Sequence, residues 1–114
     1  MMAHRSLTRR DIVEKGPAQI ALMVASEFGR ASSRAVHRGN VLSCYARARE
    51  LMGILETLPL PKTVGARLKP LFARMIEREI LLENRLTPHF IERSCQEFAD
   101  EFTRASAMMS KFKT

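Results

Sequence analysis

Residues 16–35 read GPAQIALMVASEFGRASSRA and carry the pattern that decides the fold. Apolar side chains recur there every three or four residues, at Ile20, Val24, Phe28, Ala31 and Ala35. This spacing places them on one face of an α-helix. Pro17 suits the first turn of that helix, because a backbone N–H would be unpaired at this position. We therefore expect a helix over residues 17–38 with one face in a core.

Three further helices are expected over residues 41–58, 64–86 and 88–110, each with an apolar face of the same period. The expected core positions are Val41, Cys44, Tyr45, Ala48, Leu51, Met52 and Leu55 in the first of these, Val64, Leu68, Leu71, Met75, Leu82 and Leu86 in the second, and Ile91, Cys95, Phe98, Phe102, Ala105 and Met109 in the third. Spacings of three and four in neighbouring helices predict an all-α fold, an antiparallel four-helix bundle.

Gly and Pro residues mark the expected helix ends. Gly39 is expected at the C′ position of the first helix and Asn40 at the N-cap of the second. Thr87 is expected to cap the last helix, which begins at Pro88. Pro70 either starts the main part of the third helix or kinks it.

The 114 residues suffice for one domain. Five Gly and five Pro supply few turns for a many-stranded sandwich or barrel. We divide the chain into a basic N-terminal arm over residues 1–15, flexible or short-helical, and a bundle over residues 16–114.

The sequence also bears on location. No run of about 18 apolar residues is present, so no membrane-spanning segment is expected. The N-terminal residues lack the pattern of a secretory signal, so a cytoplasmic protein is expected. Cys44 and Cys95 are far apart in the sequence and lack metal-ligand spacing, which favours two buried free thiols over a disulfide.

Two helices have more apolar residues than one core face requires. Residues 20–25 are apolar throughout, so Leu22 and Met23 point away from the main stripe. The third helix has a second stripe beside its core face. Such surplus is buried between two neighbours, or it forms a groove for an amphipathic partner or a symmetric homodimer. The candidate groove residues are Ile20, Leu22, Met23, Phe72, Ile76 and Ile80.

The formal net charge of +7 is concentrated before residue 50, with nine basic and three acidic residues over residues 1–49. Arg30, Arg34 and Arg38 are spaced four apart and are expected to form one basic ridge. That ridge is either a solvated face or a contact for phosphates or acidic protein surfaces. Arg30 and Arg34 complete the candidate partner-binding set. The alternative function is a nucleic-acid regulator acting through basic residues, Arg5, Arg9, Arg10, Arg30, Arg34 and Arg38.

Motifs for catalysis are absent from the sequence: there is no phosphate loop, no GxSxG and no HExxH. No two of the three His share a helix face, which argues against a His-ligated metal. We expect no cofactor. His37 is expected in the last turn of the first helix, where a cation suits the helix dipole. Arg30 and His37 loosely resemble the Arg…His pair of HEPN-type ribonucleases, without the polar motif between them. We expect no enzyme.

Several segments resemble FliS-type flagellar export chaperones. Residues 16–31, with Pro17, Leu22 and Met23, are similar to the start of the first long helix of that family. Residues 40–55, NVLSCYARARELMGIL, resemble its second helix, which ends in a similar "ELM…L" pattern. The pattern of the third helix is matched by Leu71, Phe72, Met75, Leu82 and Asn84.

The resemblance covers roughly residues 16–108. It implies a cytoplasmic, non-catalytic chaperone that binds the disordered C-terminal segment of flagellin. The client would form helices on apolar grooves of the bundle, and this would prevent its polymerisation before export. Arginines at the rim would guide encounter with an acidic client.

Overall fold

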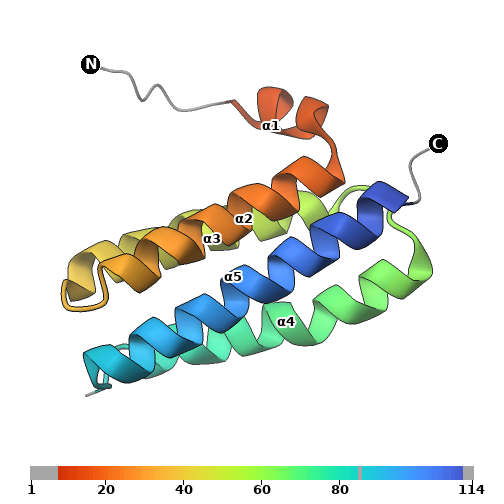
Figure 1. Ribbon diagram of the computed structural model, residues 1–114. Coiled ribbons are helices and arrows are strands. Elements are labelled where there is room, and N and C mark those ends of the chain that lie inside the picture. Colours follow the sequence, from red (N-terminus) through yellow and green to blue (C-terminus); the bar gives the residue numbers. More distant parts are fainter. Residues whose placement is uncertain (1–7, 85, 112–114) are drawn as a thin grey trace.

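The computed structural model describes residues 8–84 and 86–111, and every regular element in them is an α-helix. The helices are α1 (Arg9–Lys15), α2 (Pro17–Ser33), α3 (Arg38–Glu56), α4 (Lys62–Leu81) and α5 (Pro88–Lys111). The long helices lie side by side, and α2 packs most extensively, against α5 and then α3 (Figure 1). The radius of gyration of 14.0 Å is that of a compact globule of this length. The all-α prediction is confirmed.

The short helix α1 is stabilised at its start and joined to α2 by a glycine. The Thr8 hydroxyl accepts a hydrogen bond of 3.1 Å from the Asp11 N–H, and the Asp11 carboxylate accepts one of 3.2 Å from the Thr8 N–H. This is a reciprocal capping box. Gly16, with φ of 86°, ends α1 and caps α2, a conformation that favours glycine. Pro17 is the first residue of α2, as predicted.

Small side chains let α2 and α5 approach closely. Their buried small residues are Ala21, Ala25 and Ala31 on α2 and Ser94, Ala99, Ala105 and Ser106 on α5. The Ser106 hydroxyl donates a hydrogen bond of 2.7 Å to the Ala18 carbonyl of α2. The buried residues of α4 are larger, namely Val64, Leu68, Leu71 and Met75. In keeping with this difference in side-chain size, α5 packs more extensively on α2 than on α4.

The centre of the core is aromatic. The ring of Phe28 on α2 lies 5.1 Å from that of Tyr45 on α3 in an edge-on arrangement. Its centroid is 4.9 Å from Phe98 and 6.0 Å from Phe102, both on α5. These separations are typical of favourable aromatic pairs, so one side chain joins three helices.

The predicted core positions are confirmed almost completely. All five apolar positions of the first stretch, from Ile20 to Ala35, are buried, and so are all those predicted in α3 and α5. In the third predicted helix only Leu86 is not fully buried, and it packs on the edge of the core.

The predicted junction at Gly39 and Asn40 is wrong. Helix α2 already ends at Ser33, where the Ser33 hydroxyl donates a hydrogen bond of 3.0 Å to the Arg30 carbonyl. Serine side chains compete in this way for backbone groups and weaken a helix. Helix α3 begins at Arg38, with His37 at its N-cap, so Gly39 and Asn40 lie in its first turn.

The ends and interior of α4 also differ from expectation. The helix begins at Lys62 and continues through Pro70, so the alternative in which Pro70 starts its main part is wrong. It ends at Leu81 rather than residue 86, because the N–H of Glu83 bonds to the Ile80 carbonyl at 3.1 Å and tightens the turn. At the start of α5, Thr87 accepts a hydrogen bond of 3.1 Å from the Phe90 N–H, as predicted.

Across residues 8–84 and 86–111, no helix has both the length and the apolar character that crossing a membrane requires.

Candidate functional site

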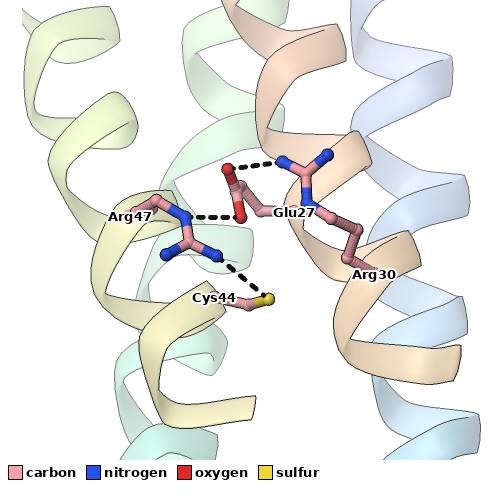
Figure 2. A network of polar contacts seen from close by, with 4 residues as sticks. All are labelled: Glu27, Arg30, Cys44 and Arg47. Atoms are coloured by element: carbon pink, nitrogen blue, oxygen red, sulfur yellow. Dashed lines mark hydrogen bonds and ion pairs between the residues drawn. The ribbon is translucent and has the colours of Figure 1, made fainter. Parts of the chain in front are cut away.

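A buried carboxylate on α2 is held by two arginines. Glu27 is 7% exposed. Its Oε2 accepts a hydrogen bond of 2.7 Å from Arg30, one turn further along α2, and its Oε1 accepts one of 3.0 Å from the Nε of Arg47 on α3. Figure 2 shows the carboxylate between the two guanidinium groups. The arginine side chains are about half exposed, at 49% and 50%, so each keeps donors free toward the surface.

Arg47 also contacts a thiol. Its Nη2 lies 3.5 Å from the Cys44 sulfur, one turn back on α3 (Figure 2). Partial burial of Arg47 lowers its pKa. The hydrogen bond to Glu27 and the attraction of that carboxylate have a larger combined effect, so the pKa of Arg47 is raised. Burial, and then the charge of Glu27, raise the pKa of the Cys44 thiol. Cys44 is therefore a poor nucleophile at neutral pH.

Two open hollows flank this network. The α5-side hollow, of about 600 Å³, lies between α2 and α5 and is lined by residues that include Leu22, Met23, Ser26, Arg30 and Thr103. The α3-side hollow, of about 650 Å³, lies among α1, α2 and α3 and is lined by residues that include Ile12, Met23, Arg47, Leu51 and Ile54. Met23 and Glu27 line both hollows. We call Leu22, Met23, Glu27 and Arg30 of α2, together with Arg47 of α3 beside them, the α2 face.

The structure brings only part of the predicted groove together. Leu22, at 39% exposed, and the half-buried Met23 lie on the α2 face. Ile20 is 0% exposed and belongs to the core, so its assignment to a groove is corrected. The remaining candidates lie on α4, which is not among the helices packed extensively on α2. They cannot extend the same groove; they are Phe72, Ile76 and Ile80.

The predicted basic ridge does not form. Because α2 ends at Ser33, Arg34 is its exposed C-cap and Arg38 lies in the first turn of α3. Arg30 is engaged with Glu27, and Arg38 donates a hydrogen bond of 2.9 Å to the Asn84 carbonyl. The three arginines therefore do not line one helix face.

The arm predicted to bind nucleic acid is partly described. Arg5 lies outside the described residues. Arg9 donates a hydrogen bond of 3.3 Å to the Thr57 hydroxyl, which ties α1 to the end of α3. Arg10 is exposed.

The second cysteine, Cys95, is a buried residue of α5. Cys44 and Cys95 are buried free thiols, as predicted. Burial raises the pKa of the Cys95 thiol to about 11, and burial also raises the pKa of Tyr45. His37 occupies the N-cap position of α3, without a side-chain capping hydrogen bond, instead of lying in the last turn of the first helix. Within residues 8–84 and 86–111, no group of three or more His, Cys, Asp or Glu is placed to hold a metal ion.

The sequence prediction missed Glu27 and Arg47. Glu27 follows Val24 by three and precedes Ala31 by four, so it interrupts the apolar stripe. A charged residue at such a position signals a buried ion pair. The pattern does not reveal its partner 20 residues away on another helix.

Comparisons of the chain with protein-family models, with curated proteins and with solved structures found no match.

Proposed function

We propose that the protein is a non-catalytic cytoplasmic chaperone or adaptor, in which α2–α5 form an antiparallel four-helix bundle that binds an amphipathic segment of a secreted client. The α2 face carries this proposal, since it combines exposed apolar surface with half-exposed arginines between two hollows. The resemblance of residues 16–108 to FliS-type flagellar export chaperones supports flagellin as the client.

The apolar part of the α2 face suits a helical ligand. Leu22 and Met23 border the α5-side hollow, and Met23 also borders the α3-side hollow. An amphipathic segment laid along α2 would cover both side chains with its apolar residues. Methionine is flexible and polarizable, so Met23 adapts to different apolar side chains.

The charged part of the α2 face favours an acidic flank on the client. Glu27 neutralises one of the two guanidinium charges and holds both groups in place, which leaves the trio with a net positive charge. The exposed edges of Arg30 and Arg47 would attract client carboxylates and mainly raise the association rate. Binding would then be salt-dependent without being abolished by salt.

A chaperone of this kind would act by covering the apolar residues of its client segment. The resemblance implies that the C-terminal segment of flagellin is disordered before export. Binding on the α2 face would order that segment and withhold it from other flagellin molecules until export.

Limited proteolysis tests the proposal. Purified protein is mixed with flagellin from the same genome, and cleavage of the flagellin C-terminal segment is followed over time. We expect protection by the wild type and by Val36→Glu, which alters an apolar residue 70% exposed outside the α2 face. Leu22→Glu is expected to lose protection. Absence of protection by the wild type would refute flagellin as the client.

The same preparation tests the nucleic-acid alternative. Binding of a DNA or RNA duplex that weakens steeply between low and physiological salt would favour a regulator using arginines such as Arg10 and Arg34. No duplex binding is expected from the present proposal.

A further inference from the structure

Helix α4 has an apolar stripe outside its core face. Phe72, Ile76 and Ile80 are spaced four apart and therefore share one side of the helix. Phe72 is half-buried, whereas Ile76 is 40% and Ile80 63% exposed. The core face of α4 is a different set of residues, Val64, Leu68, Leu71 and Met75.

Opposite charges stand at the two ends of this stripe. Lys69 precedes Phe72 by three residues and Glu83 follows Ile80 by three. Both are exposed, and neither forms an ion pair with another described residue. Glu83 follows the C-cap of α4, where a negative charge opposes the helix dipole. Its position therefore does not stabilise α4 itself.

The order of these residues is palindromic. From Lys69 through Phe72, Ile76 and Ile80 to Glu83, the spacings are three, four, four and three. Ile76 is the centre, the apolar side chains lie at equal distances on either side, and opposite charges lie at equal distances beyond them.

We propose that a second copy of this chain covers the stripe, with the two α4 helices antiparallel about a two-fold axis at Ile76. Residues equally distant from position 76 then face one another. Ile76 meets its counterpart, Phe72 meets Ile80 of the second copy, and Lys69 meets Glu83 of the second copy. Each apolar contact and each ion pair occurs twice about the axis.

The charges of Lys69 and Glu83 favour the antiparallel pair over a parallel one. A parallel pair of α4 helices would place Lys69 against Lys69 and Glu83 against Glu83, which repel. The antiparallel pair converts both contacts into attractions. A closed two-fold dimer also leaves no free copy of the stripe, so association stops at two chains.

The size of the stripe sets the strength of the dimer. Its helical part, from Lys69 to Leu81, is about 18 Å long, at 1.5 Å per residue. One helix pair of this length buries less than the roughly 1,600 Å² of a standard interface. The dimer is therefore weak and forms as the protein concentration rises.

The dimer does not depend on the proposed client. The α2 face and the stripe lie on helices that are not extensively packed together, so dimerisation leaves the α2 face open. Val36 belongs to neither surface and serves as the common control.

Sedimentation velocity over a concentration series tests the proposal. The full chain is expected to pass from monomer to dimer, and Val36→Glu is expected to do the same. Ile76→Glu places two carboxylates at the axis and is expected to remain monomeric, with a circular dichroism spectrum like the wild type. A wild type that is monomeric throughout, or an Ile76→Glu dimer, would overturn the proposal.

A charge exchange tests the antiparallel register. Lys69→Glu and Glu83→Lys each replace two attractions by two repulsions, and each is expected to weaken dimerisation about tenfold. Mixing these two variants restores both ion pairs in the heterodimer, so the mixture is expected to dimerise like the wild type. A mixture no stronger than either variant alone would contradict the register.

Discussion

Oε1 of Glu27 on α2 accepts a hydrogen bond of 3.0 Å from Nε of Arg47 on α3. Arg30 binds the other oxygen at 2.7 Å, so the carboxylate is satisfied on both sides although it is only 7% exposed. This contact fixes α2 against α3 at the place where the two hollows meet. It therefore links the packing of these two helices to the shape of the α2 face.

Removing the charge of Glu27 should destabilise the fold. In Glu27→Gln, two arginines lose their anionic acceptor, and we expect a loss of about 1–2 kcal/mol because both guanidinium groups remain half exposed to water. Urea unfolding measures this difference. The matched control Glu77→Gln alters an exposed glutamate of α4 and should change stability by less than about 0.5 kcal/mol. Equal stability of the two variants would argue against the network.

Truncating Phe28 should have a larger effect. Its ring is 0% exposed and contacts three aromatic rings, so Phe28→Ala is expected to cost about 3–5 kcal/mol through lost burial and a cavity. Val36→Ala, at a side chain 70% exposed, should change the unfolding free energy by less than about 0.5 kcal/mol. A loss below about 1 kcal/mol for Phe28→Ala would contradict a central role of this ring in the core.

Alkaline pH should destabilise the protein through its buried thiol. Burial raises the pKa of Cys95 to about 11 from the ordinary 9.0, so above pH 9 the unfolded chain loses this proton while the folded chain keeps it. Stability therefore falls between these two values, by at most about 2–3 kcal/mol from this group. Burial raises the pKa of Cys44 and of Tyr45, which act in the same direction.

The measurement compares urea midpoints at about pH 8 and about pH 10.5 for the wild type and Cys95→Ala. The variant should lose less stability between the two pH values than the wild type. The same loss in both proteins would show that Cys95 does not contribute.

The cap of α5 gives a smaller, local test. Thr87→Ala removes the acceptor for the Phe90 N–H and should cost about 1 kcal/mol in urea unfolding. Thr87→Ser keeps a hydroxyl at the same position and should retain most of the stability. If serine and alanine cost the same, the hydrogen bond is not the cause.

Local patterns predicted much of the fold. The apolar period placed α5 within one residue of its observed ends, and Pro17 and Thr87 marked helix starts correctly. These features depend on residues within a few positions of one another. Helix α2 ends at Ser33, five residues before the predicted end. The Ser33 hydroxyl donates a hydrogen bond to the Arg30 carbonyl there, whereas the prediction relied on Gly39 and Asn40 as the signals of the helix end.

The candidate site was less predictable. Leu22 and Met23 follow from a surplus of apolar residues on one helix, but the burial of Ile20 depends on which neighbours cover α2. The pairing of Glu27 with Arg47 joins two helices, and no spacing along the chain encodes it. The prediction of a ridge of Arg30, Arg34 and Arg38 is wrong for a related reason. Because α2 ends at Ser33, Arg34 and Arg38 do not continue the helix that carries Arg30.

The most direct test of the proposed α2 face is a calorimetric titration with the C-terminal segment of flagellin from the same genome. The wild type and Val36→Glu should bind it with equal affinity, and Leu22→Glu should weaken binding at least about tenfold, because it removes buried apolar area and adds a charge. If the segment does not bind the wild type, or binds Leu22→Glu as tightly, the α2 face is not its binding site.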